Sequence, residues 1–145
     1  MKYLPISNQL FVKNRARFNV KLSGNDIAIF NANDIMPTNA DGTMPFRQNN
    51  DLFWLSGVDQ EESVLVISPN HPDENMREVL FLKETNEHIA IWEGAKLTKD
   101  DALKTSGIKT VFWLNELENK LAELISKADA IYLNENIHSR AASKV

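Results

Sequence analysis

Apolar residues recur at helical spacing near the start of the chain, in the stretch from Asn8 to Leu22. Phe11 and Phe18 fall on one side of a helix, with basic residues on the other side. Ser7 stands where an N-cap residue is expected, and Gly24 follows the last apolar position. These start and stop signals predict an amphipathic helix.

Short apolar runs follow that are too compact for helices and are rich in Val, Ile and aromatic residues. They are nearly continuous rather than alternating, which is typical of strands whose two faces are both covered. The predicted strands are Ile27–Phe30, Phe53–Leu55, Val64–Ile67, Val79–Leu82, Ile89–Trp92, Val111–Leu114 and Ile131–Leu133.

The connections between these runs predict a mixed sheet. Segments 69–75 and 83–88 are short and polar, so the strands beside them should be antiparallel neighbours, because a parallel pair needs a longer crossover. In the last third, a helix opened by Thr98 and closed by Gly107, and another over 115–127, separate the strands. We expect an α/β fold with a mixed sheet of about six or seven strands and helices on both faces.

One segment follows neither pattern. Residues 35–48 hold two prolines, a glycine and several Asn or Asp residues, which predict a long irregular loop. A loop of this length inside a compact domain is usually functional or disordered.

Composition narrows the function classes. The 145 residues suit one domain, and the net charge of −4 argues against a nucleic-acid-binding surface. The absence of cysteine excludes a thiolate nucleophile and a Cys-ligated zinc site. No targeting segment or membrane-spanning run is apparent, so we expect a cytoplasmic protein that binds neither membrane nor nucleic acid.

Carboxylates offer one route to chemistry. Asp26, Asp34, Asp41 and Asp51 lie at predicted strand ends or in loops, where a metal-dependent nuclease on a ribonuclease-H-like sheet would hold its ligands. Nothing in their spacing requires a metal site, and the acidic net charge counts against a nuclease.

The cluster from Phe46 to Gly57 is more specific. It places Arg47, Gln48, Asn49 and a nearby Asp51 directly before an aromatic run. One interpretation is that Arg47 and Asp51 pair and pin the long loop to the sheet. The alternative is that the three residues 47–49 face a cleft or a partner.

A second unusual feature is Trp92, which ends an apolar run beside Gly94. Residue type alone favours core packing for this side chain.

These two clusters resemble the N-terminal domain of Xaa-Pro aminopeptidases (aminopeptidase P). The segment 46–57 matches the family's aromatic-Arg-Gln-Asn pattern, followed by an Asp, an aromatic run and a Gly. Residues 62–66 and 91–94 match the family's Glu-Ala/Ser-Val and Ile-Trp-x-Gly patterns. The order of predicted elements agrees over nearly the whole chain.

The resemblance implies one part of a two-domain protein similar to creatinase and prolidase. Residues 1–135 would form the N-terminal domain, with a creatinase-like fold and a ribonuclease-H-like motif. Residues 136–145 would begin the linker to a C-terminal "pita-bread" catalytic domain outside this chain. That domain would hold two Mn²⁺ ions and remove the N-terminal residue preceding proline. This chain would carry no catalytic residue, metal ligand or cofactor.

The resemblance also implies the partners and the site. The chain would contact its own catalytic domain, support a homo-oligomer (a dimer or tetramer) and line the cleft for a peptide with proline in second position. Trp92 and Asp41 would be lent to a neighbouring subunit's cleft. Arg47, Gln48, Asn49, Asp51 and Gly57 would form the supporting structural motif. The alternative is a free-standing α/β binding module without a peptidase domain.

Overall fold

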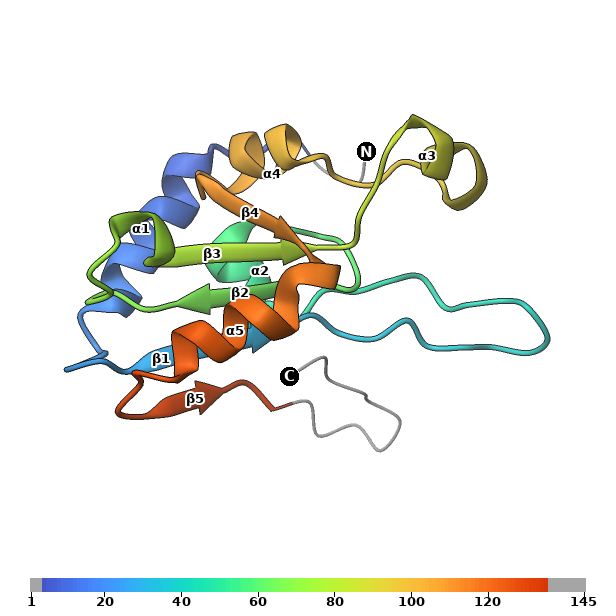
Figure 1. The fold of residues 1–145 in the computed structure, drawn as a ribbon. Helices are drawn as coiled ribbons and strands as arrows, with labels where there is room; N and C mark the ends of the chain where they lie inside the picture. The colour runs from blue at the N-terminus through green and yellow to red at the C-terminus, as the bar shows by residue number, and fades with distance from the viewer. Residues whose placement is uncertain (1–3, 136–145) are drawn as a thin grey trace.

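The computed structural model describes residues 4–135, which form a mixed five-stranded sheet in the order β4-β3-β2-β1-β5 (Figure 1). The helices are α1 (Asn8–Asn19), α2 (Asn50–Ser56), α3 (Glu87–Glu93), α4 (Lys99–Ser106) and α5 (Leu117–Ile125). The strands are β1 (Ile27–Asn31), β2 (Val64–Ile67), β3 (Glu78–Leu82), β4 (Thr110–Trp113) and β5 (Ile131–Leu133). Single 3-10 turns span Glu74–Met76 and Leu114–Glu116.

The sheet has the predicted mixed character. β2 pairs antiparallel with β1 and with β3, whereas β4 runs parallel to β3 and β5 runs parallel to β1. The described residues form five strands, so the expected six or seven are not confirmed. The central strands are buried on both faces as predicted, but β5 is an edge strand whose three side chains are exposed.

The predicted strand Phe53–Leu55 is wrong, because these residues lie in helix α2. The Asn49 side chain accepts hydrogen bonds from the backbone N–H groups of Asp51 and Leu52, which caps the first turn. Gly57 ends the helix in the left-handed conformation at φ 70°. A short apolar run carries no period long enough to distinguish a helix from a strand, and here the two caps decide.

The predicted strand Ile89–Trp92 is also wrong. It lies in helix α3, capped by the Asn86 side chain, which accepts from the backbone N–H of Ile89 at 2.9 Å. β3 therefore has no antiparallel neighbour after it in sequence. The chain instead passes through α3 and α4 and returns as β4, parallel to β3, as a crossover of this length permits.

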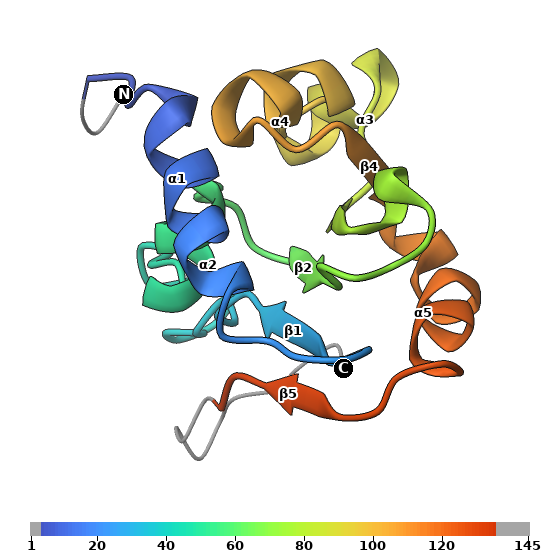
Figure 2. The ribbon, with the colours of Figure 1, turned by 90° about the vertical axis from the view of Figure 1, so that its left-hand side faces the viewer.

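Helices cover both faces of the sheet, as expected (Figure 2). On one face, Leu52 and Leu55 of α2 and Ala102 of α4 pack against apolar side chains of β2 and β3. On the other face, Leu121 and Leu124 of α5 pack against side chains of β1, β2 and β3. Burial of these two apolar layers drives the formation of the domain.

Arg15 is a buried cation within the first layer, with a relative exposure of 1%. Its guanidinium donates to the carboxylate of Glu78 at 2.8 Å and to the backbone carbonyls of Leu55 and Ser106 at 2.7 and 2.9 Å. One side chain of α1 thus joins α2, α4 and β3. Its burial is tolerated because its charge is paired and its donors are satisfied.

The predicted linker at 136–145 lies outside the described residues, so its boundary stays a prediction. Within residues 4–135, no helix is long and apolar enough to cross a membrane.

Candidate functional site

Two projections leave the same edge of the sheet. We name them the loop arm (residues 32–47, after β1) and the helical arm (residues 83–98, after β3, with α3 at its end). β1 and β3 are both antiparallel to β2, so their carboxyl ends lie at one edge, and Figure 1 shows both arms extending beyond it. In α/β sheets, ligands commonly bind outside the carboxyl ends of strands.

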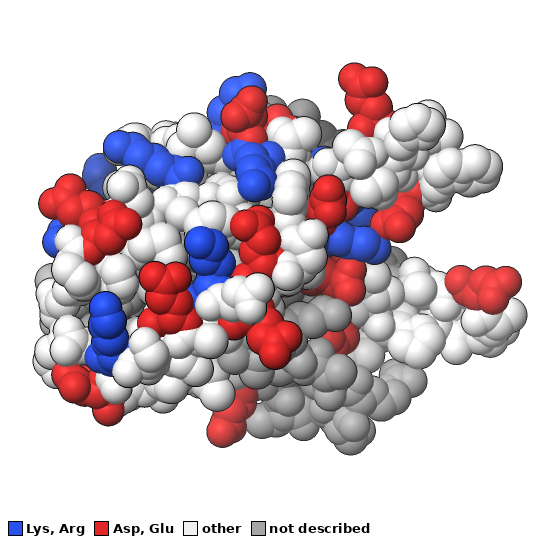
Figure 3. All heavy atoms as spheres, viewed as in Figure 1, with Lys and Arg blue, Asp and Glu red and all other residues white. Residues whose placement is uncertain are grey.

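A gap separates the two arms on the face seen in Figure 3. Acidic and basic side chains gather where the gap begins, next to the body of the domain. The arms therefore form two walls of an open cleft.

The loop arm is an ordered, narrow ribbon. A bridge joins Pro37 and Thr43, and the backbone N–H of Met44 donates to the carbonyl of Met36 at 2.8 Å. The turn at its tip passes through Ala40 at φ 49°, and Asp41 lies exposed there. The irregular loop expected from the sequence thus projects its carboxylate into solvent at the far end of the arm.

The helical arm presents Trp92, whose relative exposure is 86%. The neighbouring Ile91 is 74% exposed, and α3 contains no buried residue. Trp92 is therefore not a core residue of this chain, and the interpretation from residue type alone is wrong. An exposed Trp on a projecting helix is suited to contact a ligand or another chain.

Gln48 holds the end of the loop arm nearest the sheet. Its side-chain nitrogen donates to the backbone carbonyls of Val58 and Gln60 at 3.1 and 2.8 Å. Its side-chain oxygen accepts from the backbone N–H groups of Asn33 and Asn49 at 3.2 and 2.8 Å. Because Gln48 is buried, these four bonds satisfy groups that water does not reach.

The expected pair between Arg47 and Asp51 does not form. Both side chains are exposed, and the ion pairs of the described residues include no contact between them. Asp51 instead lies in the first turn of α2, where a negative charge is favourable beside the helix N-terminus. Arg47 and Gln48 line a cavity of about 610 Å³, whereas Asn49 does not line it. The alternative in which residues 47–49 face a cleft or a partner stays a prediction.

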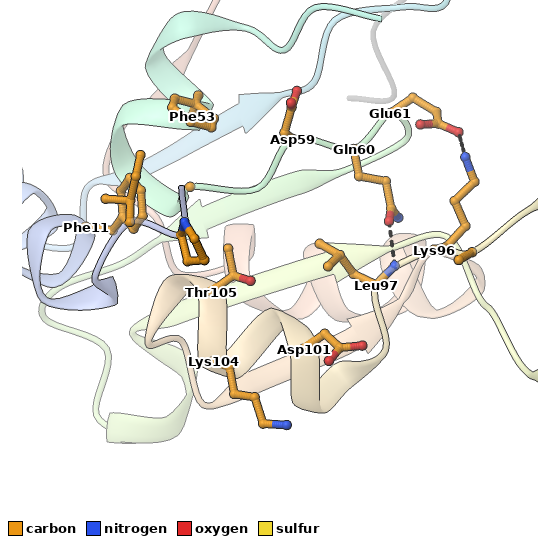
Figure 4. Close-up of a pocket in the computed structure, with 14 residues that line it drawn as sticks. Phe11, Phe53, Asp59, Gln60, Glu61, Lys96, Leu97, Asp101, Lys104 and Thr105 are labelled. Carbon is orange, nitrogen blue, oxygen red and sulfur yellow. Dashed lines mark hydrogen bonds and ion pairs between the residues drawn. The ribbon is translucent and has the colours of Figure 1, made fainter. Parts of the chain in front are cut away.

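Segment 58–62 holds the root of the helical arm, and the sequence motifs gave no sign of this role. The Gln60 side chain accepts from the backbone N–H of Leu97 at 2.8 Å, and Glu61 forms an ion pair with Lys96 (Figure 4). Lys83 pairs with Glu62 at 3.4 Å and with Glu93 at 2.7 Å. The bond to Glu93, aided by the charge of Glu62, raises the pKa of Lys83 above 10.5.

A cavity of about 730 Å³ lies between α1, α2, α4 and the root of the helical arm. Figure 4 shows the residues that line it. Phe11, Phe53 and Leu97 supply apolar lining, and Gln60 lies at its wall. Neither this cavity nor the one beside Arg47 is lined by Asp41 or Trp92. The two expected site residues are thus on the open arms rather than in an enclosed pocket.

The described residues do not supply a metal centre. No group of three or more His, Asp or Glu side chains within residues 4–135 is placed to hold a metal ion. In particular, Asp26, Asp34, Asp41 and Asp51 do not converge, so they do not form the ligand set of a nuclease. The resemblance places the two Mn²⁺ ions in a catalytic domain outside this chain, so we assign no ligand for them among residues 4–135.

Comparison with known proteins gives the family. The family model for the aminopeptidase P N-terminal domain matches residues 11–132. The Xaa-Pro aminopeptidase of Escherichia coli K12 is 28% identical over 127 residues, which cover 88% of this chain and 29% of that protein. A probable Xaa-Pro aminopeptidase of Ajellomyces capsulatus is 33% identical over 86 residues, covering 59% of this chain and 18% of that protein.

Solved structures agree with this result. Aminopeptidase P from Escherichia coli in its low pH form superposes with a TM-score of 0.81 at 26% identity, over 94% of this chain and 31% of that one. The aminopeptidase of Pseudomonas aeruginosa has the same fold, with a TM-score of 0.84 at 24% identity, over 94% of this chain and 30% of that one. The chain thus spans under a third of the length of these relatives, and it belongs to the family of aminopeptidase P N-terminal domains.

Proposed function

We propose that this chain serves as the non-catalytic accessory domain of a proline-specific aminopeptidase, and that its two arms form part of the substrate cleft. The parent protein would remove an N-terminal residue that precedes proline. Hydrolysis would take place in a catalytic domain beyond this chain, which would hold two Mn²⁺ ions. The parent would be a cytoplasmic homo-oligomer, a dimer or a tetramer.

The observation that carries this proposal is the exposure of Trp92 on the helical arm, with Asp41 exposed on the facing loop arm. A Trp that is 86% exposed contributes little to the stability of its own domain, so its presence calls for a contact outside this chain. A flat indole is a suitable wall for a proline ring. We infer that the arms reach the cleft of a neighbouring subunit and contact the peptide there.

The first test is enzymatic. The 145-residue chain alone should release no N-terminal residue from an Xaa-Pro peptide in the presence of Mn²⁺. Turnover that copurifies in proportion to the chain would overturn the proposal. A free-standing binding module is the alternative, and the coding sequence after Val145 separates the two. A continuation that encodes a metal-binding peptidase domain supports the accessory role.

The second test asks whether Trp92 acts across subunits. In the full protein, one set of subunits carries Trp92→Ala and a second set carries a disabled metal site. If Trp92 is lent to a neighbour, mixed oligomers regain activity that neither parent has, because a metal-disabled subunit supplies Trp92 to an intact site. Failure of mixing to restore activity contradicts the lending of Trp92 between subunits.

A further inference from the structure

Segment 58–62, between α2 and β2, contacts the roots of both arms. The arms follow different strands and are separated by this segment along the chain. Asp41 and Trp92 belong to the two arms and not to this segment, and both are exposed.

Three consecutive residues of this segment bind the helical arm. The Gln60 carboxamide holds the backbone of Leu97, and the Glu61 carboxylate holds Lys96, as the dashed lines in Figure 4 show. The Glu62 carboxylate holds Lys83 at the opposite root of the same arm, and Lys83 also reaches Glu93 at the end of α3. Both roots are therefore tied, which restricts rotation of the arm about either one.

The same segment binds the loop arm through its backbone. The carbonyls of Val58 and Gln60 both accept from the buried side chain of Gln48, the residue that follows the arm. The Gln48 side chain also accepts from Asn33, so it closes the two ends of the loop arm against the segment. Gln60 takes part in both sets of contacts, with its carbonyl on one side and its carboxamide on the other.

Leu97, at the root of the helical arm, packs against the apolar core, but apolar packing is weak in the outer part of the arm, where polar contacts are decisive. α3 contains no buried residue, whereas Glu61 and Lys96 have side-chain exposures of only 14% and 18%. The Gln60 side chain is 95% buried, since its relative exposure is 5%, and its nitrogen has no hydrogen-bond partner in the described part of the chain. Burying this nitrogen without a partner is costly, and the hydrogen bond from Leu97 to the carboxamide oxygen offsets part of that cost.

We propose that segment 58–62 is a positioning element, whose contacts with Gln48, Lys83, Lys96 and Leu97 fix the location of Trp92 relative to Asp41. This inference rests on the proposed function, in which those two residues line one substrate cleft. The residues of the segment act through the arms and do not themselves contact substrate.

The direct test is a distance measurement between the arms. The chain has no cysteine, so Asn39→Cys on the loop arm and His88→Cys on α3 take nitroxide labels specifically. Pulsed electron spin resonance then gives the distribution of the label-to-label distance. The parent chain should give one narrow distribution. The triple variant, which combines Lys83→Gln with Glu61→Gln and Lys96→Gln, should increase the width of this distance distribution at least twofold.

Matched variants separate positioning from general damage. Lys109→Gln removes an exposed lysine remote from both arms and should leave the width unchanged. Charge reversal, Glu61→Lys with Lys96→Glu, keeps the ion pair and should retain the narrow distribution. If the triple variant does not fold, Lys83→Gln alone is the fallback, because this lysine is 37% exposed, and the heteronuclear NOE of residues 87–93 should then fall.

An unchanged distance distribution in a folded triple variant, or unchanged NOE values in Lys83→Gln, overturns the inference. Neither result bears on the proposed function, because both are measured without substrate or catalytic domain. Conversely, if subunit mixing fails while the distribution widens, the proposed function fails and the positioning of the arms stands. In the full protein, the loss in kcat/KM from Glu61→Gln with Lys96→Gln should be less than additive with that from Trp92→Ala.

Discussion

The carboxamide of Gln48 donates to the backbone carbonyl of Gln60 at 2.8 Å, and the carboxamide of Gln60 accepts from the backbone N–H of Leu97 at the same distance. These two bonds connect the end of the loop arm to the root of the helical arm through a single residue. The arms are thus joined at their bases although their tips are separate. The bond between Gln48 and Gln60 is buried and the bond between Leu97 and Gln60 is partly buried, which makes their loss costly.

Gln48→Ala should destabilise the domain by roughly 2–4 kcal/mol, because it leaves buried backbone donors and acceptors without partners. The neighbouring Arg47→Ala is the matched control, since Arg47 is exposed, and it should change stability by less than about 0.5 kcal/mol. Urea denaturation of the two variants and the parent chain measures both changes in the free energy of unfolding. A larger loss of stability from Arg47→Ala than from Gln48→Ala would contradict the conclusion that Gln48 holds the loop arm.

Gly57→Ala should cost roughly 2–4 kcal/mol. The residue has φ 70°, and a Cβ there would overlap the ring of Phe11. Gly94→Ala is the comparison for backbone strain alone, because no atom lies within 4 Å of an added Cβ there. Gly94 has φ 81° and ψ 168°, a region nearly restricted to glycine, so this strain should be about 1–3 kcal/mol. Equal losses in the midpoint of thermal unfolding would show that the contact with Phe11 is unimportant.

Trp92→Ala should change the stability of the 145-residue chain by less than about 0.5 kcal/mol, because the side chain is 86% exposed. Phe81→Ala, at a fully buried position of β3, should cost about 3–5 kcal/mol in the same denaturation series. A cost for Trp92 close to that for Phe81 would mean that the indole is buried in solution.

Asp101 should make stability depend on pH in the acid range. Its hydrogen bonds with the side chain and backbone of Thr98, at the start of α4, lower the pKa of its carboxyl below 3.8. The ionised carboxylate of Asp101 therefore contributes fully to the free energy of unfolding at pH values above 3.8, its pKa in the unfolded chain. This contribution is lost as the pH falls through the lower pKa of the folded state. The difference in unfolding free energy between the parent and Asp101→Asn should therefore decrease as the pH falls below 3.8.

Asp100→Asn, an exposed position in the same helical turn, is the control for this titration. If the difference between the parent and Asp101→Asn stays constant as the pH falls below 3.8, the contribution of the capping box is not electrostatic.

The caps and apolar runs of the sequence were sufficient to predict much of the fold. The helix between Thr98 and Gly107 and the strands Val64–Ile67 and Ile131–Leu133 have the predicted bounds or nearly so. Helix caps depend on residues within one turn, and a strand buried on both faces appears as a continuous apolar run. Both signals can therefore be recognised in the linear sequence. The Arg-Gln-Asn cluster at 47–49 likewise lies at the base of the loop arm, where Gln48 makes the contacts that hold it.

Only the tertiary structure decided which apolar runs have a place in the sheet, and Phe53–Leu55 and Ile89–Trp92 have none. A short apolar run pairs as a strand only if a neighbouring strand is available at the right edge, and that neighbour is chosen by contacts distant in sequence. Here β4 takes the place beside β3, which leaves Ile89–Trp92 outside the sheet. The caps Asn49, Gly57 and Asn86 were visible signals for the two helices.

The tertiary structure also decided which polar residues support the arms. Arg47 and Asp51 are close in sequence and opposite in charge, yet Gln48 makes the anchoring bonds, because it is the residue whose side chain is turned into the domain. The partners of Gln60, Glu61 and Glu62 lie more than twenty residues away, at 83 and 96–97. Pairing over such separations depends on where the folded strands bring the chain, so no local pattern encodes it.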